Sequence, residues 1–262
     1  MKLPPWLISI FVISILPSVA AYLSQRATHR SLSNFGSRFA AGANLTRTLP
    51  FRRHYLPPPQ AIAMSFLSNF FGGGAYSSAI DYESFPYPAC ELGSAALEGR
   101  VLSSAGRNPR LSVATFAGGC FWGLELAYQR VPGVLYTAVG YTQGDMERPS
   151  YSAVCAGGTG HTEAVAVFYD PSAVEYGTLL DVFLDRVDVT TVNGQGNDFG
   201  TQYRTGVYTH NADQMKMARA RFEEVAEIIG AGPRGPKTVA TELLEAKVFW
   251  PAEKYHQQYL EK

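Results

Sequence analysis

Short β-branched or aromatic runs alternate with longer amphipathic segments between residues 111 and 260, and this alternation restricts the chain to a fold that combines a sheet with helices. Strands are predicted over 111–117, 134–141, 162–169, 202–208 and 238–244. Helices are predicted from apolar positions at helical spacing over 121–130, 176–187, 211–229 and 252–260. The connections are irregular, so residues 111–262 are expected to form one domain, an α+β or α/β sandwich.

The first 80 residues differ sharply in charge from the rest of the chain. Seven basic residues and no acidic residue precede Asp81, whereas the remainder has fifteen basic and 22 acidic residues, a net charge of −7. An apolar run over 6–16, followed by small residues to Ala21, is typical of a secretory signal peptide over 1–21. The run is shorter than the roughly 18–20 residues that span a bilayer, although a membrane anchor is the alternative.

Residues 22–63 are rich in Arg, Ser, Ala and Thr, which is the composition of an organellar transit peptide. Together the two segments resemble the bipartite presequence of proteins sent to complex plastids. We therefore expect a plastid protein, with the secretory pathway or the mitochondrion as alternatives, and no stable membrane insertion of the mature chain. Residues 64–110 contain Gly72, Gly73 and Gly74 and are expected to form a linker or an extended arm of weak order.

Composition excludes several functional classes for the body of the chain. A mildly acidic body has no basic face to hold phosphates, so nucleic acid is not an expected partner. Three cysteines without a CxxC pair, and five histidines without HxxxH spacing, indicate neither a disulfide scaffold nor a metal site. We expect no bound cofactor, and a monomer.

Cys120 lies where the first predicted strand ends, after Gly118 and Gly119, and where a helix begins. Free N–H groups and partial positive charge at a helix start favour an anion, so the thiol is expected to be biased toward the nucleophilic thiolate. Phe121 and Trp122 follow at once and would suit an apolar pocket for a methyl group. The alternative is a buried cysteine with two core aromatics.

The motif GGCFWG at 118–123 resembles the active-site signature of type A peptide methionine sulfoxide reductases. The resemblance extends from about residue 113 to 260, with matching segments YSAVCAGGTGHTEAV (151–165), GQGNDFGTQYRTGVY (194–208) and YHQQYL (255–260). We expect a two-layer α/β sandwich with a ferredoxin-like mixed sheet and flanking helices. The resemblance implies reduction of the S epimer of methionine sulfoxide, free or in proteins, in protein repair under oxidative stress.

The resemblance also assigns roles to individual residues. Cys120 would attack the sulfoxide sulfur, and Glu163 would protonate the oxygen, which requires a neutral carboxyl with a pKa raised by burial. Tyr151 and Tyr203 match tyrosines that hydrogen-bond the sulfoxide oxygen. Without the motif, Glu163 would be read as an ordinary salt-bridge residue.

Three further residues match the family's site. Asp198 matches an acid that orients other groups, although an Asx-turn residue is the alternative. Phe121 and Trp122 match the aromatic wall around the substrate methyl group. His161, next to the proposed acid, is expected to bond locally and to take no part in proton transfer.

The chain departs from the family in how Cys120 would be regenerated. Many members carry resolving cysteines in a C-terminal tail, but the given sequence has no cysteine after Cys155. The sulfenic acid formed on Cys120 must be reduced. We expect direct reduction by thioredoxin or another thiol, with Cys90 and Cys155 as alternative resolving residues; one hypothesis is a Cys90–Cys120 disulfide during turnover.

Two loop positions also differ from many relatives. Val189 stands where Pro is common, and Phe199 stands where Arg is common. Both changes are expected to alter contacts at the rim of the site.

Two other functions compete with the reductase. A non-enzymatic redox sensor or a binding module for oxidised peptides would keep the pocket and the cysteine but lack turnover. A cysteine hydrolase would need a histidine base near Cys120, for which His161 and His256 are the candidates.

Overall fold

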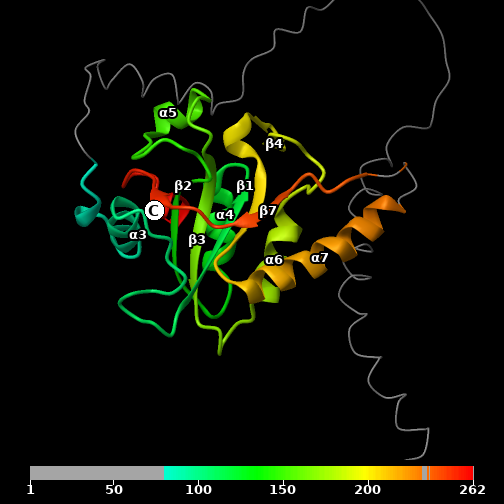
Figure 1. The fold of residues 1–262 in the computed structure, drawn as a ribbon, viewed down its shortest axis with the longest axis horizontal. Helices are drawn as coiled ribbons and strands as arrows, with labels where there is room; N and C mark the ends of the chain where they lie inside the picture. Colours follow the sequence, from blue (N-terminus) through cyan, green and yellow to red (C-terminus); the bar gives the residue numbers. More distant parts are fainter. Residues whose placement is uncertain (1–79, 232–234, 236, 262) are drawn as a thin grey trace, which may run out of the picture. The chain divides into compact units, whose positions relative to one another are not determined.

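Six strands form one mixed sheet in the spatial order β7-β6-β1-β3-β2-β8 (Figure 1). The computed structural model describes residues 80–231, 235 and 237–261, so the segments predicted at 1–21 and 22–63, and the arm up to residue 79, lie outside it. Neighbouring strands are antiparallel except β6 and β7, which are parallel. The strands are β1 (Ser112–Gly118), β2 (Val134–Thr142), β3 (Thr162–Tyr169), β6 (Thr205–Thr209), β7 (Glu242–Glu245) and β8 (Trp250–Pro251).

The four central strands are connected in the ferredoxin-like way. Helix α4 (Phe121–Gln129) joins β1 to β2, and α6 (Tyr176–Arg186) comes between β3 and β6. The short helix α5 (Tyr151–Cys155) lies in the connection from β2 to β3, and α7 (Ala212–Gly230) follows β6. The spatial order β6-β1-β3-β2 then places the first and third strands of this unit at its centre. The predicted α+β fold, with a mixed sheet and flanking helices, is confirmed.

The first face of the sheet packs against helices α4, α6 and α7. Phe116 and Val165 point to this face and share one core cluster with Leu124 of α4, Phe183 of α6 and Phe222 of α7. Every residue of β3 is buried, because this strand lies between β1 and β2 and both of its faces are covered. The helix predicted from Asn211 is confirmed, since that side chain accepts a hydrogen bond from the Gln214 N–H at 2.9 Å.

The second face of the sheet is covered by the arm that precedes β1. A 3-10 turn, η2 (Tyr82–Ser84), and helix α3 (Ala89–Leu97) form this arm. Tyr82 and Leu92 of the arm share a core cluster with the alanines of β2 and β3 and with Trp250. The expectation of weak order is therefore wrong for residues 80–110, because bulky apolar side chains of the arm fill the space that the small strand residues leave.

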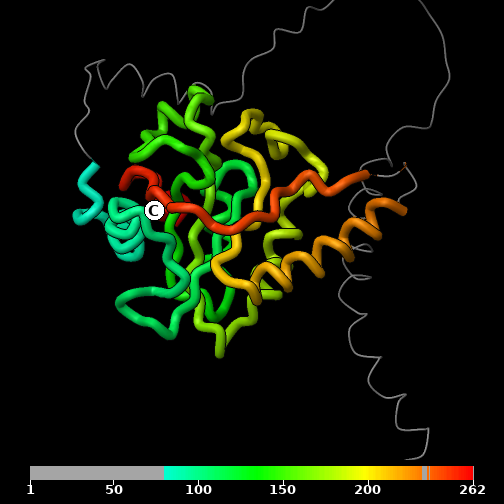
Figure 2. Tube along the Cα trace, in the orientation of Figure 1, coloured from blue at the N-terminus to red at the C-terminus, as the bar shows by residue number. Residues whose placement is uncertain are grey.

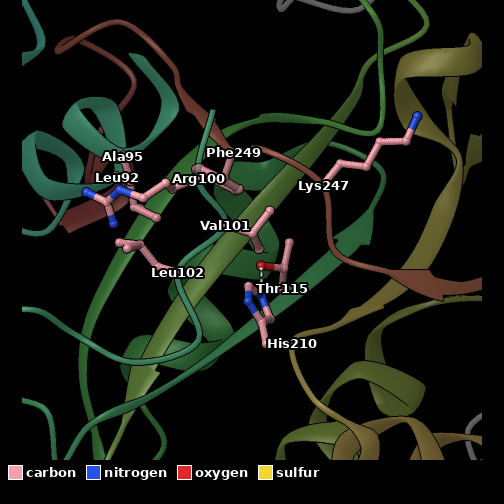
Figure 3. Close-up of a pocket in the computed structure, with 9 residues that line it drawn as sticks. All are labelled: Leu92, Ala95, Arg100, Val101, Leu102, Thr115, His210, Lys247 and Phe249. Atoms are coloured by element: carbon pink, nitrogen blue, oxygen red, sulfur yellow. Dashed lines mark hydrogen bonds between the residues drawn. The ribbon is translucent and has the colours of Figure 1, made fainter. Parts of the chain in front are cut away.

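A small cavity lies between the arm and the second face of the sheet (Figure 3). Figure 3 shows Thr115 of β1 and His210 pointing toward one another, and their Oγ1 and Nε2 atoms are 2.8 Å apart. Leu92 and Leu102 line the cavity from the arm. This hydrogen bond pairs Thr115 with one ring nitrogen of His210, in a cavity that Arg100 and Lys247 also line.

The Gly/Asn/Asp-rich loop predicted at 193–200 contains a small hairpin. Strands β4 (Gly194–Gln195) and β5 (Asp198–Phe199) pair antiparallel, and the 3-10 turn η3 (Thr201–Tyr203) follows. The Gln195 side chain holds the hairpin to the end of α6, because its oxygen accepts from the Asp188 N–H at 2.8 Å and its nitrogen donates to the Asp188 carbonyl at 2.8 Å. The hairpin is thereby fixed close to the end of β1.

The prediction of a helix over 252–260 is wrong. Figure 2 shows the last part of the chain crossing from the β7 edge to the β8 edge of the sheet, and turns follow β8 up to the 3-10 turn η4 (Tyr259–Glu261). The Gln257 side chain accepts from the Val139 N–H at 3.1 Å and donates to the Val139 carbonyl at 2.9 Å. Gln258 has a left-handed backbone with φ of 53°. These bonds anchor the segment to the edge of β2 and prevent a continuous helix.

Within the described part of the chain, no helix has the length and apolar character needed to cross a bilayer.

Substitution of Gly140 tests the packing of β8 on β2. A Cβ atom at this position would lie 2.5 Å from Phe249 Cε1 and would also press on the Trp250 carbonyl. We expect Gly140→Ala to lower the free energy of unfolding by about 1–3 kcal/mol, because an overpacked site must shift its neighbours. Urea unfolding of the two proteins measures this difference. Gly123→Ala is the control, since a Cβ there meets no atom within 4 Å, and an equal loss in both variants would contradict the packing argument.

Candidate active site

Cys120 stands at the junction between β1 and α4, as predicted, and is the N-terminal capping residue of α4. Two glycines before it allow the close approach of neighbouring elements. A Cβ on Gly118 would lie 2.7 Å from Val187 Cγ1, and a Cβ on Gly119 would lie 2.8 Å from Gln195 Cβ. Gly119 also has a φ of 78°, a conformation that glycine adopts without strain. The two glycines therefore allow the cysteine to lie between the end of α6 and the β4–β5 hairpin.

Glu163 of β3 lies directly beside the start of α4. Its carboxylate oxygen Oε2 accepts a hydrogen bond from the Phe121 N–H at 3.1 Å, and only 1% of the residue is exposed. Phe121 is the first residue of α4, whose N–H has no partner within the helix. The structure thus brings the predicted acid to the residue next to the predicted nucleophile, on the face of the sheet that carries the helices.

Burial controls the protonation of both groups. It raises the pKa of the Glu163 carboxyl to about 8, where the Phe121 N–H opposes the shift and the charge of Asp198 adds to it. Burial also raises the pKa of the Cys120 thiol to about 12, and the charge of Glu163 contributes in the same direction. The expected bias of Cys120 toward thiolate is therefore wrong for the free protein.

The N-terminus of α4 does act on Cys120, but more weakly than burial. The backbone N–H groups of Trp122 and Gly123 lower the pKa of the thiol, although the Cys120 side chain makes no capping hydrogen bond, whereas the charges of Glu163 and Asp198 raise that pKa. Loss of solvent contact for an anion outweighs the two N–H groups. The same N–H groups remain in place to stabilise negative charge that develops on the sulfur during a reaction.

Two tyrosines lie around this pair. Burial raises the pKa of Tyr151 and of Tyr203, and the charge of Glu163 raises the pKa of both as well. The charges of Asp198 and Cys120 also act on Tyr203. The predicted residues are thus close enough to influence one another, and both phenol groups remain protonated donors at neutral pH.

Asp198 reaches the site from the β4–β5 hairpin. Its charge raises the pKa of Cys120, of Glu163 and of Tyr203, so its carboxylate lies close to all three. The neighbouring Phe199 is 78% exposed, which agrees with a position at the rim. Val189 does not belong to the rim, because it is 7% exposed and packs in the main core.

An aromatic cluster borders the site, as expected from Phe121 and Trp122. Phe121 is buried, and Trp122 stacks on Tyr259 with ring centroids 4.0 Å apart. His256 lies among these rings, 5.3 Å from Phe121 and 4.7 Å from Tyr151 between ring centroids. The apolar surroundings suit a methyl-bearing group better than a charged one.

The two histidines proposed as hydrolase bases are not arranged for that role. Burial lowers the pKa of His256 to about 4, and neither ring nitrogen has a hydrogen-bond partner within the described residues. The His161 ring bonds locally, with Nδ1 accepting from the Gly144 N–H at 3.2 Å and Nε2 lying 2.8 Å from the Met146 carbonyl. His161 is therefore held by its own loop, as the sequence predicted.

Sequence reasoning missed Glu253, which follows β8 in the C-terminal segment. Its Oε1 atom accepts from the Tyr151 N–H at 2.8 Å, and its Oε2 atom accepts from the Tyr141 O–H at 3.1 Å. The motif YHQQYL lies in this part of the chain, but no sequence pattern marks the acidic residue just before it as a functional residue.

The other two cysteines occupy different places. Cys90 packs against the second face of the sheet, opposite the face that carries Cys120. Cys155 is exposed at the end of α5, where its sulfur accepts a hydrogen bond from Tyr151. A Cys90–Cys120 disulfide within one chain would require the arm to leave the sheet.

No group of three or more His, Cys, Asp and Glu side chains in residues 80–231, 235 and 237–261 is arranged to hold a metal ion. A larger hollow of about 860 Å³ lies between the arm and α7 and is lined by residues such as Val101, Met215 and Glu245. Neither this hollow nor the cavity under the arm includes Cys120 or Glu163 among its lining residues.

Comparison with solved structures finds the same fold in enzymes of one family. Methionine sulfoxide reductase A of Corynebacterium diphtheriae has a TM-score of 0.56 and 37% identity, covering 59% of this chain and 76% of that one. Mxr1 from Saccharomyces cerevisiae in reduced form has a TM-score of 0.53 and 35% identity, covering 58% and 85%.

Comparison of the amino-acid sequence with known proteins points to the same family. Peptide methionine sulfoxide reductase A2-1 of Oryza sativa subsp. japonica is 52% identical over 152 residues, which are 58% of this chain and 78% of the relative. Peptide methionine sulfoxide reductase A4, chloroplastic, of the same plant is 52% identical over 149 residues, which are 57% of this chain and 54% of the relative. The family described as "Peptide methionine sulfoxide reductase" matches residues 112–262, more than half of the chain. This chain therefore belongs to the type A peptide methionine sulfoxide reductases, a family of oxidoreductases that act on sulfur groups.

Proposed function

We propose that this chain reduces the S epimer of methionine sulfoxide, free or in proteins, through attack of the Cys120 sulfur on the sulfoxide sulfur. The observation that carries the proposal is the hydrogen bond between the buried Glu163 carboxylate and the Phe121 N–H at 3.1 Å. This contact holds an acid with a raised pKa next to the nucleophile. A sulfoxide is reduced only if its oxygen is protonated, and a neutral carboxyl can supply that proton.

Both groups are protonated before substrate binds. Since the pKa of Glu163 is about 8 and that of Cys120 about 12, these two side chains are neutral at neutral pH. A bound sulfoxide changes this balance, because its polar oxygen accepts the Glu163 proton as the Cys120 sulfur attacks. The N–H groups of Trp122 and Gly123 stabilise the negative charge that the Cys120 sulfur carries once its proton has left and before its bond to the substrate sulfur forms.

The reaction balances with one thiol and one sulfoxide. A bond forms between the Cys120 sulfur and the substrate sulfur, and the oxygen is protonated by Glu163. The S–O bond of the substrate and the new S–S bond then break as the hydroxyl group moves to the Cys120 sulfur and methionine leaves, so that Cys120 is oxidised to a sulfenic acid and the substrate is reduced by two electrons. The proton that leaves the thiol restores the neutral Glu163.

The remaining residues orient the substrate. Tyr151 and Tyr203 donate hydrogen bonds to the sulfoxide oxygen, for which their high pKa values keep the O–H groups intact. Phe121 and Trp122 form the wall that accepts the methyl group, and Asp198 orients polar groups at the edge of the site. A charged or bulky group in place of the methyl would be excluded by the aromatic cluster.

Regeneration of Cys120 requires a thiol. We propose that thioredoxin or another external thiol attacks the sulfenic acid directly, in a monomeric enzyme. Cys155 is the better placed of the two alternative resolving residues, because it lies on the helix that carries Tyr151 and bonds to that residue. Cys90, on the opposite face of the sheet, is the weaker alternative.

The chain is also proposed to act in a plastid. The composition of residues 1–63 supports this location, and the relatives in Oryza sativa and Arabidopsis thaliana that are 52% identical include proteins named as chloroplastic. A role in repair of oxidised proteins within the organelle follows.

The proposed activity is tested with the two sulfoxide epimers and dithiothreitol as reductant. We expect turnover of the S epimer, no activity in Cys120→Ser, and a loss of about 10²-fold to 10⁴-fold in Glu163→Gln, which removes the proton donor. Glu245→Gln, at an exposed position in β7, is the matched control and should retain full activity. Binding of the sulfoxide without turnover would instead support a sensor or binding module, and turnover of the R epimer would contradict the proposal.

The raised pKa of Glu163 predicts how stability depends on pH. The native state keeps a proton up to pH 8, whereas the unfolded chain releases it near the ordinary value of 4.5. This contribution to stability is complete below about pH 4.5 and is lost as the pH rises through about 8. Glu163→Gln lacks the ionisation, so its free energy of unfolding should exceed that of the wild type at pH 8. Urea unfolding across this range checks the sign, and a variant less stable at pH 8 would contradict it.

The targeting role of the proposed presequence is tested by fusing residues 1–63 to a fluorescent protein in a cell with a complex plastid. We expect fluorescence in the plastid, because the signal-like part directs entry into the secretory pathway and the transit-like part directs import. A fusion of residues 22–63 alone is the control and should stay outside the secretory pathway. Fluorescence that is only secreted would contradict plastid localisation.

A further inference from the structure

The carboxylate of Glu253 joins two elements of the site. One oxygen accepts from the N–H of Tyr151 at 2.8 Å, and the other accepts from the O–H of Tyr141 at 3.1 Å. The side chain is only 22% exposed, so both bonds form largely out of contact with solvent. Hydrogen bonds to an ionised carboxylate are stronger than those between neutral groups.

Tyr151 depends on such a contact for its position. Helix α5, which it begins, has only five residues, too few to be stable by itself. Its first N–H groups lack partners within the helix. Ser150 caps the helix by accepting from the Ala153 N–H at 3.3 Å, and Glu253 takes the N–H of Tyr151 itself.

Tyr141 links this contact to the proposed acid. In the sheet, Tyr141 of β2 is the register partner of Glu163 of β3. The Glu253 carboxylate, bonded to Tyr141 and to Tyr151, therefore sets the distance between the strand pair that carries the acid and the helix that carries the tyrosine. A change at Glu253 alters the relative position of two groups that must meet at one sulfoxide oxygen.

The segment that carries Glu253 is itself firmly held. Gln257 bonds both backbone groups of Val139, and the Gln258 N–H donates to the buried Glu125 carboxylate at 3.1 Å. His256 packs its ring on Tyr151, with centroids 4.7 Å apart. The Glu253 carboxylate is therefore held in a fixed position, as required of a group that orients another side chain.

We infer that Glu253 is a positioning residue of the reaction, which acts through Tyr151 and holds that tyrosine's O–H where the sulfoxide oxygen is protonated. The inference rests on the proposed function, since it assumes that Tyr151 bonds this oxygen. An interaction that strengthens as charge develops on the oxygen changes kcat more than KM.

The first experiment compares Glu253→Ala with Glu253→Gln in the S-epimer assay. Glu253→Ala should lower kcat by about tenfold and leave KM within about twofold, because the Tyr151 N–H loses its acceptor. Glu253→Gln keeps an oxygen acceptor for the Tyr151 N–H and should retain more than half of the activity. Glu91→Ala is the matched control: this carboxylate accepts backbone N–H bonds from Gly106 and Arg107 in the arm, and its removal should leave kcat unchanged.

The second experiment repeats Glu253→Ala in a Tyr151→Phe background. If Glu253 acts through the Tyr151 O–H, the tenfold loss in kcat should shrink to less than about twofold. An undiminished loss in that background would overturn the inference while leaving the reductase intact. A fully active Tyr151→Phe would instead refute the role that the proposed function gives Tyr151, and the inference would fall with it. If Glu253→Ala does not fold, Tyr141→Phe, which removes the other donor to the carboxylate, replaces it in the same cycle.

Discussion

The hydrogen bond from the Phe121 N–H to the Glu163 carboxylate is the contact on which the rest of the site depends. It joins the centre of the sheet to the first turn of α4, where Gly118 and Gly119 let β1 end close against α6 and the hairpin. The sheet order places β3 beside β1, so the proposed acid in β3 and the proposed nucleophile just after β1 lie close together although they are far apart in sequence. The ferredoxin-like topology therefore supplies the pairing of the two groups, and local side chains refine it.

One environment acts in opposite ways on the two reacting groups. Removal of water keeps a proton on Glu163, which favours its use as an acid, but the same removal disfavours the Cys120 thiolate. The expected effect of a helix N-terminus on a thiol was reasonable in sign, since N–H groups of Trp122 and Gly123 do lower the pKa of Cys120. The predicted thiolate is nevertheless wrong, because burial and the nearby Glu163 carboxylate raise the pKa of Cys120 more than the N–H groups lower it. In the free protein the Cys120 thiol therefore keeps its proton at neutral pH.

Much of the fold could be predicted because its signals are local. Strand 162–169 and the helix capped by Asn211 follow directly from β-branched content, apolar spacing and a capping side chain. The meeting of Cys120, Tyr151, Glu163 and Tyr203 was predicted from motif resemblance, since nothing in their spacing requires it. The closing helix was mispredicted because Gln257 uses its side chain to bond β2 and Gln258 is left-handed. Glu253 could not be foreseen for the same reason: its partners are about one hundred residues away, and only the fold brings them together.

The arm has a consequence for how the chain can be matured. The second face of the sheet presents alanines at its centre, Ala138, Ala164 and Ala166, and a face of such small side chains needs bulky partners to exclude water. Tyr82 and Leu92 supply them, although both precede the residues shared with the family, 112–262. If the proposed presequence were cleaved after Tyr82, the loss of this side chain would expose apolar surface on the sheet and favour aggregation. The packing of η2 therefore limits any cleavage of the proposed presequence to a site upstream of Tyr82.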